Sequence, residues 1–337
     1  MCTSLRTVWL AREPNLSGKY SRVYRQEDAM FPDRPEYVAC GNCMHCRWVR
    51  AFENQVRSIH ESSLYENSCF ITLTYSPENV PKVGNSNVSR LSLRHDDFQD
   101  FMKKVRKHNV GMTSLIDPTT DKYIRPIRYS MCGEYGDKTG RPHYHASIFN
   151  FNWTDLRQFG WSKGWNKQGK HPLYTSAKLE KLWGHGNVQV CRFTPDTAGY
   201  VARYVTKKVI GKQACEDAYQ FVDSTTGEVF RQESVYSRAS NKRGIGYPWY
   251  ARYRSDIYPS DFIVYKGNPF RPPKYYDKCF EQEFPDLFYD VKVKRDEKLA
   301  LKKDIVVNSD FYRSMDAKAL LVERKVNQYV RSLDDGF

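Results

Sequence analysis

The stretch RPHYHASIFNF, residues 141–151, carries the pattern that predicts the fold. It has the length and the aromatic and β-branched content of a strand. Because side chains alternate faces along a strand, His143 and His145 project to one side while Tyr144 projects to the other. About 7 Å separates the two histidines along the strand, so both imidazoles can bind one divalent cation. Alone, a His-x-His pair is weak support, since most such pairs are ordinary surface or core residues.

A second strand precedes this one. Residues 124–135, IRPIRYSMCGEY, have strand composition, and the short GDKTG segment that follows predicts a hairpin. Pairing in the hairpin brings Glu134 beside His143 and His145. Two imidazoles and a carboxylate form a mixed nitrogen and oxygen site that suits Mg²⁺ or Mn²⁺ bound to a substrate phosphate. The alternative is that Glu134 is a solvated residue at the end of the hairpin.

Periodicity predicts further elements on both sides of the hairpin. A helix is expected around Val49–Ile59, and FITLTY, residues 70–75, reads as a strand. Residues 93–109 predict an amphipathic helix. Its inward residues are expected to be Phe98, Phe101, Met102 and Val105. Four segments show little regular pattern: the first forty residues and 152–190 are expected to be irregular, 211–275 to be loop-rich, and 292–333 to form one or two helices.

The segment TAGYVARYVTKKVI, residues 197–210, predicts a helix that supplies a nucleophile. At about 100° per residue, one face carries Tyr200, Arg203, Tyr204 and Lys207. Roughly opposite, toward the expected sheet, lie Val201, Ala202, Val205 and Val209, with Lys208 on the flank. A phenol has a pKa near 10, so as a nucleophile it needs a metal-polarised phosphate or a nearby cation. The alternative is that these tyrosines only flank a core helix.

The charge of the chain points to a polyanionic partner. With 53 basic and 39 acidic residues the formal charge is +14, which favours nucleic acid first. The alternative is a basic protein without such a partner. No apolar stretch approaches the roughly 18 residues of a membrane span, and the N-terminus lacks the pattern of a secretory signal. We therefore expect a soluble cytoplasmic protein with no membrane partner.

Three of the nine cysteines lie in CGNCMHC, residues 40–46. In a cytoplasmic protein, reduced thiols are expected rather than a disulfide framework. A structural Zn²⁺ site normally has four ligands, and the spacing is too tight for His45 to join Cys40, Cys43 and Cys46. The two interpretations are a zinc site completed by a distant residue and free cysteines at the start of a helix.

Taken together, these motifs resemble a known superfamily. RPHYHASIF resembles the HUH motif of rolling-circle initiators, in which a bulky apolar residue separates two histidines. FITLTY resembles the preceding strand motif of that superfamily, and GYVARYVTKK its third motif in the two-tyrosine form. More narrowly, the chain resembles the replication initiation proteins of the Microviridae, in particular of the gokushovirus branch, through CGNCMHC and GIGYPWY. The resemblance covers roughly residues 38–250 and keeps the order of the motifs.

The resemblance implies an α+β fold, with an antiparallel sheet and flanking helices of ferredoxin-like or RRM-like character. Irregular insertions and a helical C-terminal region are expected to surround this core. It also implies three parts: a peripheral segment at 1–37, an endonuclease domain at 38–250 and a mostly helical accessory region at 251–337.

The implied activity is metal-dependent nicking of DNA. His143, His145 and Glu134 would bind the metal, and Tyr200 or Tyr204 would attack the scissile phosphodiester. The products are a 5′-phosphotyrosine and a free 3′ hydroxyl, and the second tyrosine allows the strands to be rejoined. For charge stabilisation or protonation of the leaving group, helix geometry favours Lys207 over Lys208.

The resemblance also implies partners. The substrate would be the origin of single-stranded or supercoiled viral DNA, in the cytoplasm of a bacterial host. Because no GxxxxGK[ST] motif is present, unwinding is expected to depend on a host helicase, and extension on a host DNA polymerase. Expected DNA contacts are Thr72, Thr74, Arg47, Arg141, Arg203 and Arg243. Each of them is alternatively an ordinary surface or core residue.

Two other functions stay open at this point. Within enzymes, the chain could be another HUH nuclease, such as a plasmid initiator, a relaxase or a transposase. Relaxases usually place their tyrosines before the histidines, and such transposases typically have one tyrosine, so the order and the pair found here favour an initiator. In a different class, the chain could be a non-enzymatic protein that binds single-stranded nucleic acid.

Overall fold

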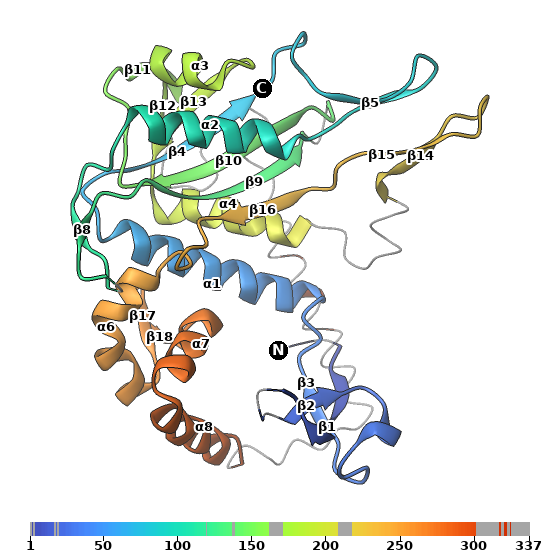
Figure 1. Ribbon diagram of the computed structural model, residues 1–337, viewed down its shortest axis with the longest axis vertical. Coiled ribbons are helices and arrows are strands. Elements are labelled where there is room, and N and C mark those ends of the chain that lie inside the picture. The colour runs from blue at the N-terminus through green and yellow to red at the C-terminus, as the bar shows by residue number, and fades with distance from the viewer. Residues whose placement is uncertain are drawn as a thin grey trace. The chain divides into compact units, whose positions relative to one another are not determined.

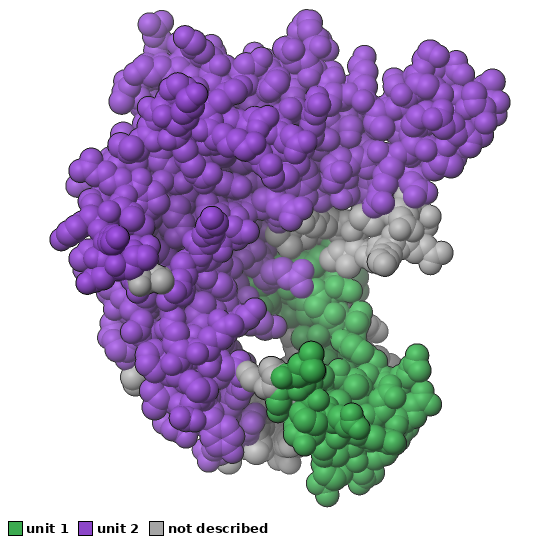
Figure 2. Space-filling model, viewed as in Figure 1, with its two compact units in different colours: residues 1–49, 303–328 green, residues 50–302, 329–337 purple. Residues whose placement is uncertain are grey.

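The structure is a computed structural model (Figure 1) that describes residues 2, 4–16, 18, 20–118, 120–136, 139–161, 171–207 and 218–300, with residues 317, 320, 321 and 324. Of residues 203–207, 259, 299 and 300 it describes the backbone alone. The chain forms two compact units (Figure 2), residues 1–49 with 303–328 and residues 50–302 with 329–337. The three-part functional division stays a prediction, and its boundary at 250 falls inside a helix.

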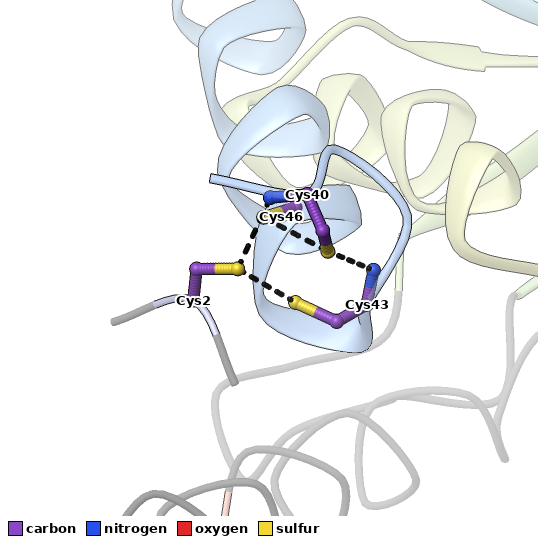
Figure 3. A group of neighbouring side chains, drawn as sticks. All are labelled: Cys2, Cys40, Cys43 and Cys46. Carbon is purple, nitrogen blue, oxygen red and sulfur yellow. Dashed lines mark hydrogen bonds between the residues drawn. The ribbon is translucent and has the colours of Figure 1, made fainter. Parts of the chain in front are cut away.

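Unit 1 contains a three-stranded antiparallel sheet in the order β2-β1-β3. Its elements are β1 (Arg6–Pro14), β2 (Tyr20–Val23), the short helix η1 (Gln26–Asp28) and β3 (Glu36–Val38). The expectation of irregular structure here is wrong, because these strands are largely exposed and so lack the apolar alternation that reveals a strand. Four cysteines gather where helix α1 (Met44–Ser62) begins (Figure 3).

Unit 2 is built on a seven-stranded antiparallel sheet in the order β11-β12-β13-β4-β10-β9-β16. The strands are β4 (Ser68–Thr74), β9 (Arg128–Tyr135), β10 (Pro142–Phe149), β11 (Arg157–Trp161), β12 (Pro172–Thr175), β13 (Val188–Arg192) and β16 (Tyr236–Ala239). The predicted α+β class, with an antiparallel sheet and flanking helices, is confirmed. The predicted hairpin is also confirmed, as β9 and β10.

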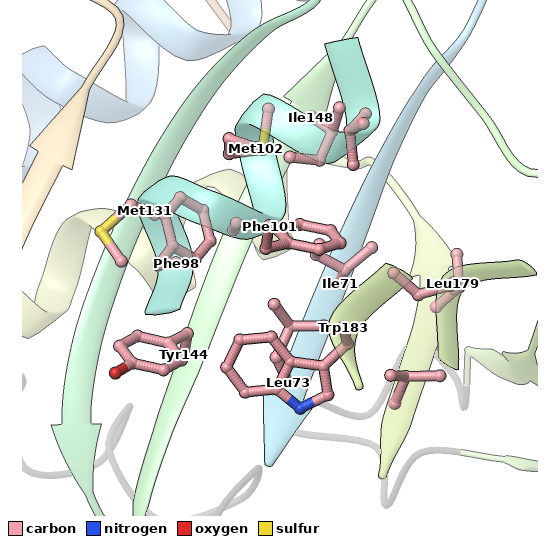
Figure 4. Packing of buried hydrophobic residues seen from close by; sticks show 14 of the residues in the cluster. Ile71, Leu73, Phe98, Phe101, Met102, Met131, Tyr144, Ile148, Leu179 and Trp183 are labelled. Atoms are coloured by element: carbon pink, nitrogen blue, oxygen red, sulfur yellow. The ribbon is translucent and has the colours of Figure 1, made fainter. Parts of the chain in front are cut away.

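One face of this sheet carries the main hydrophobic core, under α2 (His95–His108) and α3 (Ala177–Trp183). Phe98, Phe101 and Met102 of α2 pack over the strands, as predicted, and Leu179 and Trp183 of α3 extend the layer (Figure 4). The strands contribute Ile71, Leu73, Met131, Tyr144 and Ile148. Fully burying a large apolar side chain stabilises the fold by about 1.5–3 kcal/mol, so this face fixes which side of each strand points inward.

The opposite face is covered by α4 (Pro195–Lys207), which in turn packs under α1 (Figure 1). Tyr200 and Val201 both join a buried cluster with Phe70 of the sheet. On the other side, the Gln55 amide donates to the Pro195 carbonyl at 2.6 Å. The predicted orientation, with Tyr200 turned away from the sheet, is therefore wrong. The helix is covered on two sides, and the simple split into an apolar and a polar face does not describe it.

A second core lies beyond α1. Val56 of α1 packs with residues of α6 (Tyr247–Ser260), α7 (Lys274–Glu283) and α8 (Pro285–Ala300). Short antiparallel pairs complete the described chain: β5 (Lys82–Gly84) with β6 (Ser89–Leu91), β7 (Leu115–Ile116) with β8 (Tyr123–Ile124), β14 (Gln220–Val222) with β15 (Val229–Arg231), and β17 (Ile263–Tyr265) with β18 (Asn268–Phe270). Among the described residues, no helix combines the length and apolarity that a bilayer crossing requires.

The segment 152–190 is not the irregular insertion that its composition suggested. It supplies β11, β12, α3 and the start of β13, while Trp153 and Trp183 are core residues. Its strands have only four or five residues, too few for alternation to be recognised. The segment 211–275 was likewise expected to be mostly loop, but it contains β16 and α6.

A glycine next to the end of β4 tests the backbone packing. Gly186 has φ +146°, and a Cβ added to it would lie 2.2 Å from the Ser76 amide nitrogen and 2.6 Å from the Thr74 carbonyl oxygen. Because backbone atoms cannot move aside, we expect Gly186→Ala to lower the free energy of unfolding by about 2–4 kcal/mol. Urea denaturation measures this.

The matched control is Gly160→Ala in β11, where an added Cβ meets nothing within 4 Å. It should change stability by less than about 0.5 kcal/mol. Equal unfolding midpoints for the two variants would contradict the close approach described at Gly186.

Candidate active site

The register of three neighbouring strands brings the predicted metal ligands together. In the β9–β10 pair, His143 lies opposite Glu134 and His145 opposite Cys132. In the β10–β4 pair, the same histidines lie opposite Thr74 and Thr72. Because directly opposed residues share a face of a sheet, all of these side chains point to the face that α4 covers.

Two imidazoles converge on one carboxylate oxygen. Glu134 Oε1 lies 3.1 Å from His143 Nε2 and 2.8 Å from His145 Nε2. One ligand atom from each of the three residues lies within 4.8 Å of the others. Glu134 is only 2% exposed, so it is not a solvated turn residue. These three side chains form a candidate metal-binding group.

The other ring nitrogens are held by the chain itself. His143 Nδ1 lies 3.0 Å from the Arg141 carbonyl oxygen, and His145 Nδ1 lies 2.9 Å from the Thr72 hydroxyl. A carbonyl only accepts, so the proton of His143 sits on Nδ1 and the Nε2 lone pair faces Glu134. A lone pair and a carboxylate repel each other unless a proton or a cation lies between them. The donor set therefore fits a divalent cation, with outer-shell partners that orient both rings.

The electrostatics of Glu134 agree with this arrangement. Burial by itself would raise the pKa of the carboxyl group, but the hydrogen bonds and positive charge of His143 and His145 outweigh it and hold the pKa below its usual value. The carboxylate thus stays ionised inside the protein, as a metal ligand must.

Tyr200 reaches the same pocket from α4. Its hydroxyl lies 3.3 Å from His145 Nε2, and the two rings meet edge to face at 4.8 Å. The preceding Gly199 allows α1 to approach, since an added Cβ would lie 2.7 Å from the Gln55 amide nitrogen. The helix backbone continues through Arg203, Tyr204 and Lys207, whose side chains are outside the described part of the structure, and Lys208 lies beyond it.

The predicted DNA contacts have different surroundings. Thr72 is buried and its hydroxyl is engaged with His145, while Thr74 is buried beside it. Arg141 holds His143 through its backbone carbonyl. The positioning role of Thr72 was not recognised from the sequence, although pairing the FITLTY strand with residues 141–151 would have placed it opposite His145.

Two of the predicted arginines lie away from this pocket. Arg243 is exposed in the loop before α6 and lines a pocket of about 840 Å³ with Arg106, Arg238 and Lys242. Arg47 lies in the first turns of α1, within unit 1.

The cysteine cluster forms a second candidate metal-binding group. The sulfur atoms of Cys2, Cys40, Cys43 and Cys46 lie within 4.8 Å of one another. Cys2 is the distant residue that the sequence could not identify, because its separation from Cys40 matches no spacing rule.

Comparisons with known proteins give a consistent result. Residues 68–209 match the family model of the replication-associated protein ORF2. The chain is 31% identical over 259 residues to replication-associated protein VP4 of Bdellovibrio phage phiMH2K, covering 76% of this chain and 71% of that protein. It is 28% identical over 305 residues to replication-associated protein ORF2 of Spiroplasma virus 4, covering 88% and 84%. It is 27% identical to replication-associated protein ORF4 of Chlamydia phage 1, covering 77% and 58%. No solved structure matches.

The Thr72 hydroxyl offers a test of the pocket. Replacing it with the isosteric valine in Thr72→Val removes the partner of His145 Nδ1, so the ring loses its fixed orientation. We expect the affinity for Mn²⁺ to fall about 10–100-fold, the usual cost of losing an outer-shell partner. Isothermal titration calorimetry measures it.

Thr74→Val is the matched control on the same strand face, because the opposing His143 uses the Arg141 carbonyl instead. It should keep the wild-type affinity, while Glu134→Gln, which removes a ligand charge, should bind more weakly than Thr72→Val. Equal affinities for the two threonine variants would refute the role given to Thr72.

Proposed function

Because the chain belongs to the replication-associated proteins of Microviridae-type phages, we propose that it initiates rolling-circle replication by nicking single-stranded DNA at the viral origin. One observation carries the proposal: the His143, His145 and Glu134 group lies beside the phenol of Tyr200. A metal-binding group next to a nucleophile is what tyrosine-mediated cleavage of a phosphodiester requires.

The metal would be Mg²⁺ or Mn²⁺, held by Nε2 of each histidine and by the Glu134 carboxylate. Two nitrogens and one carboxylate leave positions for water and phosphate oxygens. When bound, the cation polarises the scissile phosphate as a Lewis acid. Thr72 and Arg141 keep the two Nε2 atoms turned toward Glu134.

The tyrosine then exchanges one ester for another. The Tyr200 oxygen forms a bond to phosphorus while the bond from phosphorus to the 3′ oxygen breaks, which leaves a 5′-phosphotyrosine. The phenol loses one proton and the departing 3′ oxygen gains one, so no water or energy source is consumed. The 3.3 Å contact with His145 Nε2 supports Tyr200 as the residue that attacks first.

A second tyrosine allows the reaction to be repeated. Tyr204 follows Tyr200 by one turn of α4, so it can cleave again while the first ester persists. Attack of the released 3′ hydroxyl on a phosphotyrosine rejoins the strands. Lys207, placed by helix periodicity on the side of the phenols, stabilises the developing charge or protonates the leaving oxygen.

Recognition of the DNA rests on charge. The formal charge of +14 supports binding to the phosphate backbone. We assign phosphate contacts to Arg47, Arg141, Arg203 and Arg243, and retain Thr74 as a contact beside the pocket. Unwinding and extension fall to a host helicase and a host DNA polymerase, in the host cytoplasm.

Replacing the tyrosines tests the nucleophile. With a labelled origin oligonucleotide and Mn²⁺, we expect Tyr200→Phe/Tyr204→Phe to lose the covalent adduct seen on a denaturing gel, on the order of 10³-fold or more, because no phenol remains. Tyr200→Phe alone should lose most of the first-round adduct.

Tyr289→Phe, at an exposed tyrosine of α8, is the control and should behave like the wild type. Undiminished cleavage by the double variant would rule out the tyrosine mechanism. A shifted band without any adduct in the wild-type protein would instead identify a non-enzymatic DNA-binding protein.

The two lysines at the end of α4 test the helix phase. Lys207→Ala should slow adduct formation about 10²–10³-fold, the usual loss when a charge-stabilising donor is removed. Lys208→Ala should be close to wild type. Single-turnover kinetics measures both, and the reverse order of effects would show that Lys208, not Lys207, faces the phenols.

A further inference from the structure

The four cysteine side chains in unit 1 have the spacing of ligands around one ion (Figure 3). Cys2 Sγ lies 3.8 Å from Cys43 Sγ, and Cys40 Sγ lies 4.0 Å from Cys46 Sγ. A disulfide bond measures about 2.05 Å, so these are separate thiols. Four sulfurs at about 2.3 Å from a tetrahedral Zn²⁺ stand about 3.8 Å apart, which the observed distances match.

Backbone amides already point at two of these sulfurs. The N–H groups of Asn42 and Cys43 donate to Cys40 Sγ at 3.4 and 3.2 Å, and the N–H of Cys40 donates to Cys2 Sγ at 3.2 Å. Gly41, with φ +76°, allows the turn that directs these amides back to the sulfur. A thiol is a weak acceptor, whereas a metal-bound thiolate accepts such charge-assisted hydrogen bonds well.

The start of α1 adds to this preference. Cys43 immediately precedes the helix, which begins at Met44, and Cys46 lies in its first turn. The positive end of the helix dipole stabilises negative charge there, and this lowers the cost of holding thiolates. Three independent features, namely the sulfur spacing, the amide donors and the helix terminus, favour four thiolates around a cation.

Unit 1 also needs a source of stability other than a hydrophobic core. Among the described residues 2–49, the buried apolar side chains are Cys2, Val8 and Ala29. Units with so little apolar burial usually depend on a disulfide or a structural metal. Since the thiols here are separate, a metal is the remaining staple.

We infer that Cys2, Cys40, Cys43 and Cys46 bind one structural Zn²⁺ that ties the first residues of the chain to the start of α1. Cys2 is the fourth ligand, and His45, although adjacent to Cys46 in the sequence, is not one. The ion supplies folding energy to unit 1 and takes no part in cleavage. The inference is therefore independent of the proposed function.

The experiment measures zinc bound to the full-length chain, purified through a C-terminal tag so that Cys2 keeps its position. Inductively coupled plasma mass spectrometry should find one zinc per chain in the wild type, and in the controls His45→Ala and Cys279→Ser. Cys279 is a buried cysteine of α7, outside the cluster. Cys2→Ser should weaken zinc binding by at least about 100-fold in competition with a chromogenic chelator, because losing a ligand costs more than losing an outer-shell partner.

Each measurement is repeated in the Glu134→Gln background, so that zinc at the histidine pocket is not counted. Limited proteolysis provides a readout independent of activity. Removal of zinc, or Cys2→Ser, should speed cleavage within residues 1–49 while fragments from the seven-stranded sheet stay protected.

Four results would overturn the inference. The first is a wild-type chain without zinc. The second is iron in its place, and the third is zinc that disappears with Glu134→Gln. The fourth is a Cys2→Ser variant that binds zinc as tightly as the wild type, or a His45→Ala variant that does not.

Discussion

The pairing register of β9, β10 and β4 is the constraint on which the candidate active site depends. Side chains alternate along a strand, so a slip by one residue would carry both histidines to the other face of the sheet. The hydrophobic side prevents that slip. Tyr144, which lies between the histidines in the sequence, is fully buried, and its hydroxyl bonds both the carbonyl and the amide of Arg94 and the hydroxyl of Tyr75. The core under α2 and α3 thus determines where the polar residues of the opposite face lie.

A buried charge joins the layers below the sheet. Glu61 of α1 is fully buried, forms an ion pair with Arg128 of β9 and accepts hydrogen bonds from Tyr65 and from the amide of Gly246. A buried carboxylate is tolerated only with such complete pairing. The Gly246 amide reaches it because this residue adopts φ +84°, and a Cβ there would lie 2.5 Å from the Tyr276 hydroxyl. The second glycine of GIGYPWY is thereby explained by packing.

The sequence predicted the parts of the molecule in which one periodicity governs a long segment. Strand alternation in β9 and β10 was enough to place Glu134 beside His143, and helical spacing identified the inward side chains of α2. It failed where two neighbours compete for one element or where pairing is distant. Tyr200 faces the sheet because α4 is covered on both sides, and β11 and β12 are too short to show alternation. The fourth cysteine, Cys2, is identified only by the folded chain.

The hydrogen bonds of His143 and His145 have a consequence for acidity. Each ring is anchored through Nδ1, and each Nε2 faces the same oxygen of Glu134. The space between these three atoms can be filled by a cation or by protons, but not by both. Loading the pocket therefore expels protons into the solvent, and acidification empties it while the strands that carry the ligands stay in place.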